Sequence, residues 1–395
     1  MAVVFEWTRQ LSDIGRSEWQ ACFGAGRVTA SYELQQALER AGIVDSFHYL
    51  RVLRDGRLVG IVPCFVMDYS LSDLAPVEVQ AVVRQARRVY GRLLKARLFV
   101  IGSPLAICSD LLGLPGVRDG AWDPVLAMLH QELQAKADAL GIGFVCLKEF
   151  DQALQRRLSA AFGEHYLLCR SPDTTFVSTA AVNGMGYVDN MLSKYRNVLK
   201  KRRRTFDEAG LRWVVEVNFA DHATQMHRLY LNVLERSSTR FERLSEAFFR
   251  EVCHCLGTQA YALLCFDEQR LVAFELFLAG DALHPLYLGI DYAYRDAGSL
   301  YFNCLYRIVE EAERRGVPYI ELGQTSYEAK FSIGAVSSPL YFYIRHRRGW
   351  VNRLLYLLRD GLFPAPQIPA LRNVFKHHDA YLDSLKAQGL LDHAD

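Results

Sequence analysis

The sequence predicts an α/β (α+β) protein made of two similar units, each a mixed, mostly antiparallel twisted sheet flanked by helices. Helix-like and strand-like patterns alternate along the whole chain, and the second half repeats the order of the first. The composition is that of a folded protein, with 51% hydrophobic and 23% charged residues. A chain of 395 residues is long enough for two domains.

The first half opens with a helix that begins after the N-cap residue Ser31 and ends at Gly42. A hairpin follows, because Asp55-Gly56 lies between two alternating apolar runs. The elements expected after Gly42 are strands at 47–53 and 58–66, a helix at about 76–93, a strand at 97–102, an amphipathic helix at 122–141 and a buried strand at 143–150.

The second half shows the same succession of patterns. Its expected elements are helices near 221–236 and 245–256, a hairpin at 259–280, a strand at 284–291, a helix at about 297–315, a strand at 318–323 and a last strand near 340–346.

Four matched features in the same order indicate a duplication. The hairpins carry DGRLVG (55–60) and EQRLVA (268–273), and each half later has a helix that ends in glycine, at Gly141 or Gly316, before a strand. The boundary between the halves is expected near 165–180, because the segment 170–186 is polar, contains proline and glycine, and is expected to be irregular. The expected domains are therefore residues 1–170, residues 171–348 with a basic helix at 193–209, and a helical extension at 349–395.

Charge and cysteine content exclude several classes of protein. The formal net charge is only +2, so the chain as a whole is no electrostatic binder of nucleic acid, and we expect no sequence-specific DNA binding. No apolar run is long enough for a membrane helix, and the N-terminus lacks the pattern of a signal peptide. Nine scattered cysteines indicate reduced thiols in a cytoplasmic protein. Cys253-His254-Cys255 has no second ligand pair, so no metal site is expected.

The turn that precedes the helix at 297–315 carries the pattern of an anion site. A helix N-terminus offers unpaired N–H groups and partial positive charge, which suits a phosphate or pyrophosphate. Gly298 lets the backbone approach such a ligand closely, Arg295 adds charge, and Ser299 lies at the start of the helix. The order strand, Arg-x-x-Gly-x, helix is the one that a coenzyme A pyrophosphate site needs.

This turn resembles the acyl-CoA loop of the GNAT acyltransferase superfamily, Gln/Arg-x-x-Gly-x-Gly/Ala, although Leu300 replaces the final small residue. From about residue 10 to 348 the chain is similar to the tandem-GNAT group related to Fem-type peptidoglycan aminoacyltransferases and predicted bacterial N-acyltransferases. The segments that carry the resemblance are SEWQACF, YELQQALERAG, RDGRLVGIVP, the basic segment 187–210 and TSYEAKFSIGA at 325–335. The resemblance implies two GNAT-like domains in tandem and acyltransferase activity, with acyl-CoA as co-substrate and no permanently bound cofactor.

Acyl transfer to an amine needs a base, because a free alkylamine has a pKa near ~10. Glu275 is the first candidate, since it lies within the apolar strand AFELFLA, and Asp291 at the end of the next strand is the second. Glu321, Gln324 and Tyr327 are expected to border the same cleft and to bind substrate if the strand order is that of a GNAT domain.

Lys330 has two interpretations. It is either a snorkelling surface lysine or, as the resemblance to Fem-like enzymes implies, a residue that binds an anionic group of the donor or acceptor.

The segment from Lys194 to Arg204 contains seven cations in eleven residues. It is either a solvated or acid-paired face or a dock for an anionic partner, such as tRNA, the phosphates of CoA or anionic lipid, and the neutral balance of the rest favours the dock. Residues 349–366 form an apolar or amphipathic helix. We expect it to pack on the domain; the alternative is contact with a lipid chain or the inner membrane face, with Arg345, Arg347, Arg348 and Arg353 facing headgroups.

These observations favour a cytoplasmic N-acyltransferase that moves an acyl group from acyl-CoA, or another activated carrier, to a primary amine, which a lipid, amino sugar or amino acid supplies. A Fem-type transferase that uses aminoacyl-tRNA on a cell-wall precursor is the first alternative. A catalytically inactive GNAT pair that serves as a binding module is the second.

Overall fold

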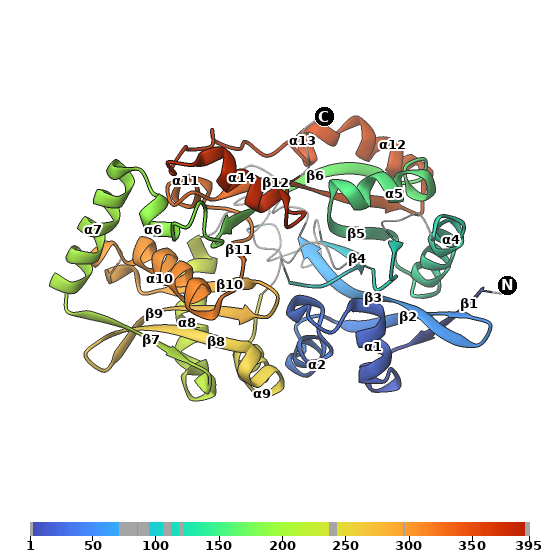
Figure 1. The fold of residues 1–395 in the computed structure, drawn as a ribbon. Coiled ribbons are helices and arrows are strands. Elements are labelled where there is room, and N and C mark those ends of the chain that lie inside the picture. The colour runs from blue at the N-terminus through green and yellow to red at the C-terminus, as the bar shows by residue number, and fades with distance from the viewer. Residues whose placement is uncertain are drawn as a thin grey trace.

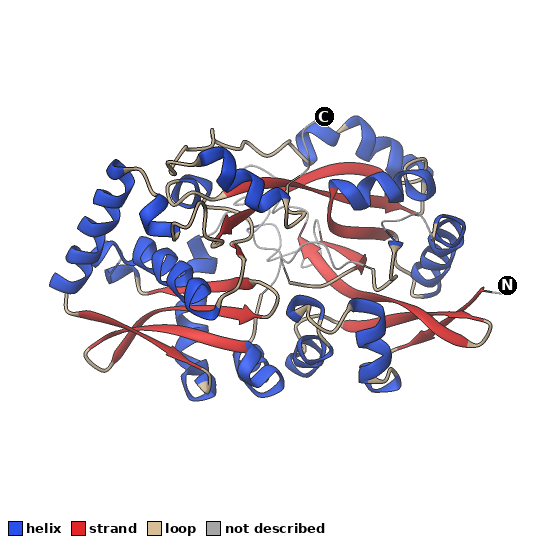
Figure 2. Ribbon diagram, in the orientation of Figure 1, coloured by secondary structure: helices blue, strands red, loops and turns tan. Residues whose placement is uncertain are grey.

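The computed structural model describes residues 3–70, 85, 95–105, 112–117, 122–236, 243–294 and 297–391. Its strands form one twelve-stranded sheet with helices on both faces (Figures 1 and 2). The strands are β1 (Val3–Thr8), β2 (Ser46–Arg54), β3 (Arg57–Ser70), β4 (Lys95–Ile101), β5 (Phe144–Asp151), β6 (Leu167–Ser178), β7 (Leu211–Glu216), β8 (Ala260–Asp267), β9 (Arg270–Ala279), β10 (Leu283–Ile290), β11 (Tyr319–Glu321) and β12 (Val336–His346). The helices are α1 (Arg16–Phe23), α2 (Tyr32–Ala41), α4 (Asp123–Ala139), α5 (Gln152–Phe162), α6 (Tyr187–Asn190), α7 (Ser193–Glu208), α8 (Ala223–Arg236), α9 (Glu246–Leu256), α10 (Leu300–Arg315), α11 (Tyr327–Phe331), α12 (Gly349–Leu357), α13 (Arg359–Leu362) and α14 (His378–Lys386).

The strand order is symmetric about the centre of the sheet: β1-β2-β3-β4-β5-β12-β6-β11-β10-β9-β8-β7. Five consecutive strands of one half run inward from each edge. The sixth strands cross over, because β12 pairs with β5 while β6 pairs with β11. In each half the fourth and fifth strands form the parallel pair, β4 with β5 and β10 with β11. The expected tandem of two similar, mostly antiparallel units is therefore confirmed, and exchange of the sixth strands joins them into one sheet.

Strand β6 extends to Ser178 and so corrects the expectation that the segment 170–186 is irregular in its first part, and the expected boundary at residue 170 falls inside this strand. Pro172 and Pro339 both lie where the register between β6 and β12 shifts. A proline removes a ladder hydrogen bond and is therefore tolerated at such an irregularity. Local composition indicated a loop here, whereas pairing with β12 and β11 on either side makes this segment a central strand.

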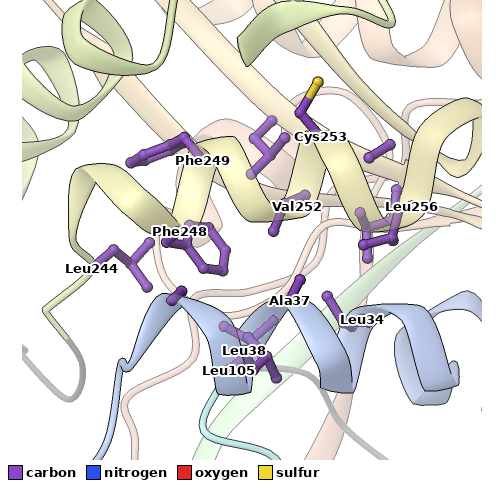
Figure 3. Packing of buried hydrophobic residues seen from close by; sticks show 14 of the residues in the cluster. Leu34, Ala37, Leu38, Leu105, Leu244, Phe248, Phe249, Val252, Cys253 and Leu256 are labelled. Carbon is purple, nitrogen blue, oxygen red and sulfur yellow. The ribbon is translucent and has the colours of Figure 1, made fainter.

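Three main clusters of apolar side chains hold the layers together. One cluster is shared by the two halves, because α2 of the first packs against α9 of the second. Figure 3 shows Leu34, Ala37 and Leu38 of α2 facing Phe248 and Val252 of α9. On the other face of the sheet, one cluster lies beneath α4 and α5 and another beneath α10 and α14. Each half thus has its own core on one face and shares a core on the other.

Most other expected elements are present. The hairpins are β2–β3 and β8–β9, and the helices expected at 122–141 and 297–315 are α4 and α10. The helix expected at 76–93 lies outside the described residues, apart from Gln85, which is helical. No helix within the described ranges is both long and apolar enough to cross a bilayer.

Candidate active site

Strands β10 and β11 open into a fork in the second half of the chain. They pair at a single position, Leu283 with Ile320, whereas the equivalent strands β4 and β5 pair at four. After Leu283, strand β10 no longer pairs with β11. Residues 285–288 are only partly buried as a result, although β10 lies inside the sheet. In the described residues, the parallel strands of the second half therefore separate after a single pair, whereas those of the first half stay paired over four positions.

A bulge lies on β10 within this opening. Pro285 pairs with Phe277 and Tyr287 with Leu276, so Leu286 is an extra residue with no partner on β9. The extra residue of a bulge is left out of the hydrogen-bonded ladder, and bulges re-aim backbone groups next to active sites. The N–H of Leu286 is consequently suited to polarise a carbonyl placed in the fork.

An ionic clasp joins the strands at the base of the fork. His284 Nδ1 lies 3.2 Å from Glu321 Oε2, and Thr174 donates to the other oxygen of Glu321 at 3.0 Å. Burial alone lowers the pKa of His284, but the carboxylates of Asp281 and Glu321 raise it to about 9. His284 is therefore an imidazolium at neutral pH, and the expected substrate residue Glu321 is already engaged by β10 and β6.

Glu275 lies on β9 opposite Leu288, beside the open part of β10. Its carboxyl group is buried under α10, where the Cys304 thiol donates to Oε2 at 3.7 Å. Burial raises the pKa of Glu275 to about 8, while the Cys304 thiol and Lys330 act in the opposite direction. A carboxyl group with a pKa near neutrality exchanges protons readily at physiological pH, which is the property a general base needs.

Lys330 is buried rather than snorkelling, and its ammonium group organises the loop after β11. Nζ donates to the carbonyls of Leu322, Gly323 and Gln324 at 2.7, 3.0 and 2.7 Å. An ammonium group has three N–H donors, so these contacts leave none for a phosphate. Burial lowers the pKa of Lys330, and Glu275 and Glu321 oppose this effect.

The loop that Lys330 holds is strained. Thr325 and Ser326 have φ of +67° and +52°, a region that residues with side chains rarely adopt. Tyr301, in the first turn of α10, hydrogen-bonds to Ser326 and lies close enough to Glu275 for that carboxyl group to affect its pKa. The loop, α10 and β9 thus meet around Glu275.

Gln324 and Tyr327 lie where the two halves meet. The Tyr327 hydroxyl donates to the Asp173 carbonyl at 2.8 Å, and Gln324 Nε2 lies 3.4 Å from the Ser171 hydroxyl. Together with Glu321, which contacts Thr174, the three expected substrate residues follow the exchanged strand β6. The structure brings them into one polar region between the halves.

Glu149 is a residue of this region that sequence reasoning missed. It has a φ of +41° at an irregularity in the pairing of β5 with β12, and Gln324 Nε2 donates to its Oε1 at 3.1 Å. Its buried Oε2 has Lys148 Nζ at 3.5 Å but no hydrogen-bond partner. Strain at a non-glycine residue often marks a functional position. The available sequence signal was the charged pair Lys148-Glu149 within an otherwise apolar strand.

Asp291 lies away from Glu275 and is already paired. Its Oδ2 accepts from Arg270 at 2.6 Å, and its Oδ1 accepts from the backbone N–H of Ala293 at 3.0 Å. Three residues of strand separate it from Leu288, the partner of Glu275, which is roughly 10 Å. The geometry therefore favours Glu275 over Asp291 as the base.

The turn before α10 is covered by helix α7. Gly298 is buried with φ +60°, and a Cβ there would lie 2.8 Å from Cα of Phe206. Asn303 Nδ2 donates to the Gly298 carbonyl at 2.7 Å and to the Arg202 carbonyl at 3.0 Å, which ties α7 to the turn. Close packing of a helix accounts for this glycine. Ser299 has φ +51° and forms no side-chain cap, and Arg295 lies outside the described residues.

The expected basic helix is α7, and only part of its charge is free. Arg202 stacks on Phe302 at 3.4 Å, Arg203 pairs with Glu310, and Arg204 pairs with Glu208. Lys200 and Lys201 remain exposed to solvent. The helix is thus both acid-paired toward α10 and basic toward solvent.

Residues 193–330, which contain the fork, Glu275 and Lys330, match the family model described as Acetyltransferase (GNAT) domain. No curated protein matches the sequence. FemX is similar in structure, with TM-score 0.53 and 12% identity over 89% of this chain and 99% of that chain. A conserved protein of unknown function from Bacteroides thetaiotaomicron VPI-5482 has TM-score 0.51 and 12% identity over 87% of this chain and 100% of that chain. A tandem GNAT protein from the clavulanic acid biosynthesis pathway has TM-score 0.48 and 12% identity over 87% and 98% of the two chains.

Proposed function

We propose that the chain is a tandem-GNAT acyltransferase that moves an acyl group from acyl-CoA to a primary amine, using the fork of its second half as the active site. The observation that carries the proposal is the single-pair fork between β10 and β11 with a bulge on its open edge. The first half keeps its equivalent strands paired, so the proposal assigns one active site to the two units.

The reaction needs three groups of this chain. The acyl carbonyl lies in the fork and accepts a hydrogen bond from the N–H of Leu286, which stabilises the negative charge that develops on its oxygen. The amine nitrogen attacks the carbonyl carbon, and the C–S bond of the thioester breaks as the C–N bond forms. Glu275 takes the proton from the amine, directly or through water, and the CoA thiolate leaves and is protonated by solvent.

The acceptor amine enters from the polar region between the halves. Glu149, Gln324 and Ser171 line that region with carboxylate, amide and hydroxyl groups. Glu149 Oε2 accepts no hydrogen bond from the described residues, with Lys148 Nζ at 3.5 Å, and it is a suitable hydrogen-bond partner for the ammonium form of the acceptor before the acceptor is deprotonated. A small amine, or the amine of a lipid or amino sugar, is the acceptor class that this lining supports.

A test of the donor uses the full chain and two CoA thioesters. Acetyl-CoA and palmitoyl-CoA are titrated while the melting temperature is followed, with uncharged tRNA as a third ligand. A rise in melting temperature that saturates with either thioester is expected, since a ligand that binds only the native state stabilises it. No rise with either thioester would reject acyl-CoA as the donor.

A matched pair of variants then tests the fork. Leu286→Pro removes the N–H and Leu286→Ala keeps it. We expect the rate of acyl transfer to fall roughly 10²–10³-fold in the proline variant and to stay unchanged in the alanine variant. The amine acceptor for this assay is identified by mass spectrometry of metabolites and lipids from cells with and without the protein. Equal activity in the two variants would argue against this N–H as the oxyanion donor.

One observation favours aminoacyl-tRNA as an alternative donor. Phe206 of α7 occupies the space beside Gly298, where a pyrophosphate would approach the turn, while Lys200 and Lys201 face solvent on the same helix. A donor held by its phosphate backbone would bind with an affinity that falls steeply with salt, whereas a CoA thioester would not. Saturable, salt-sensitive binding of tRNA without binding of either thioester would favour this Fem-type reaction.

A further inference from the structure

Helix α12 and the turn after it present an apolar stripe to solvent. Trp350, Leu354, Leu357 and Leu358 are 63%, 46%, 79% and 47% exposed. Their spacing of four, seven and eight residues from Trp350 places them on one side of the helix. The sequence favoured packing of this segment on the domain, but its largest apolar side chains remain uncovered by the described residues.

The stripe faces outward because the opposite side of α12 is fixed to the sheet. The side chain of Asn352 accepts from the N–H of His346 and donates to its carbonyl, both at 2.7 Å. After α13, Phe363 packs edge-on against Phe342 of β12, with ring centroids 5.4 Å apart. These contacts hold α12 in one orientation, so the exposure of the stripe is a property of the fold.

The segment that carries the stripe is rich in arginine. Residues 345–363 contain five arginines and one acid, Asp360, which pairs with Arg359 at 3.1 Å, while Arg347 lies 3.9 Å from Asp138 of α4. Arg348 and Arg353 are exposed and have no ion-pair partner in the part of the chain that the structure describes. An exposed apolar stripe bordered by unpaired arginines is typical of a helix that lies in the interface of a membrane.

We propose that α12 and α13 dock the protein onto the surface of an anionic phospholipid bilayer. Trp350 and the leucines enter the boundary between headgroups and acyl chains, and Arg348 and Arg353 contact lipid phosphates. A second copy of the chain is a poorer occupant, because a two-fold contact on this face would place the arginines of both copies against each other. In Figure 1, α12 lies at the upper right and the basic helix α7 at the left edge, so the two basic surfaces are separate.

Co-sedimentation with vesicles tests the proposal on the full chain. Binding is expected with vesicles that contain phosphatidylglycerol and not with vesicles of phosphatidylcholine alone, and it should weaken as salt is raised. Leu354→Asp/Leu357→Asp should lower the partition coefficient roughly tenfold or more for each leucine removed from the boundary. Arg348→Glu/Arg353→Glu should also lower it.

Two controls give the result its meaning. Met128→Asp replaces an exposed apolar side chain by a carboxylate on α4, outside the stripe. This variant should bind vesicles as the unaltered protein does. Lys200→Glu/Lys201→Glu should also retain binding; loss of binding in this variant, with α12 variants unaffected, would overturn the proposal. A dimer in solution that Leu354→Asp/Leu357→Asp dissociates, without vesicle binding, would overturn it as well. Binding of CoA thioesters is measured without vesicles, so a failure of the proposed acyltransferase function is distinguished from a failure of membrane docking.

Discussion

His284 and Glu321 join β10 and β11 across 3.2 Å at the position where those strands are still paired. One residue earlier, Leu283 is the partner of Ile320, and beyond this point the strands diverge into the fork. The pair thus lies at the origin of the opening that receives the acyl donor in our proposal. Its charge and burial therefore bear on both stability and the shape of the site.

The first prediction concerns the pH dependence of stability. His284 has a pKa of about 9 in the folded chain and an ordinary value of 6.5. Its pKa is raised, so its contribution is complete below about pH 6.5 and is lost as the pH rises through 9. The shift corresponds to about 3 kcal/mol, an order-of-magnitude figure. The urea concentration at the unfolding midpoint should decrease as the pH is raised from 6.5 to 9.5. In Glu321→Gln this decrease should be smaller.

Glu328→Gln is the matched control for that measurement. This substitution also replaces a carboxylate by an amide, but at an exposed position, where Glu328 pairs with Arg372. It should leave the slope of stability against pH unchanged. An unaltered slope in Glu321→Gln would show that the clasp does not stabilise the fork.

The second prediction concerns catalysis by Glu275. Because its pKa is raised to about 8, kcat/KM should increase with pH and reach half of its maximum near pH 8. Glu275→Gln should lower kcat roughly 10²–10⁴-fold. Cys304→Ala removes the thiol that hydrogen-bonds the carboxylate and lowers its pKa, so the midpoint should move to higher pH. A midpoint that Cys304→Ala does not move would assign the titration to another group.

The third prediction separates the structural role of Lys330, which holds the loop after β11, from the anion-binding role that the resemblance implied. Lys330→Met removes the donors to the carbonyls of Leu322, Gly323 and Gln324. Each buried acceptor left unpaired costs about 1–3 kcal/mol, so the melting temperature should fall clearly. If the lysine binds an anion of the donor instead, the melting temperature of the free protein should stay constant while the affinity for acetyl-CoA falls.

Much of this architecture could be predicted from local patterns. The hairpins at Asp55-Gly56 and 267–270, the helix that ends at Gly316 and the duplication all depend on signals within a few residues. The exchange of β6 and β12 could not be predicted this way, because Ser171-Pro172 and Ser338-Pro339 have the composition of loops and become strands only by pairing with each other.

The site was predictable in its residue types and less so in its contacts. Glu275 was recognised because a carboxyl group in an apolar strand demands an explanation. Lys330 binds backbone carbonyl groups, and Gly298 packs against Phe206, which lies far away in the sequence. The spacing of residue types along the chain reveals neither contact. Glu149 was missed because its left-handed conformation arises from the register of β5 against β12, a property of two distant segments.

The fourth prediction concerns acceptor recognition by Glu149. Glu149→Gln keeps the shape of the side chain and removes its charge, so KM for the amine should rise roughly tenfold or more while kcat changes little. Asp151→Asn would disturb the N-cap of α5 and is a poor control. Glu6→Gln, at an exposed edge-strand position, is a better one and should change neither constant. A fall in kcat alone would instead place Glu149 in the chemical step.

The last prediction tests whether α7 seals the turn before α10. Gly298→Ala and Gly316→Ala impose similar backbone strain, since the φ angles are +60° and +67°. The two differ in their surroundings: a Cβ at 298 meets Phe206 Cα at 2.8 Å, and a Cβ at 316 has nothing within 4 Å. Gly298→Ala should therefore displace α7 and expose its arginines to trypsin earlier than Gly316→Ala does. Because backbone strain is common to both variants, equal cleavage rates would mean that the contact between α7 and the turn contributes nothing to the stability of this helix.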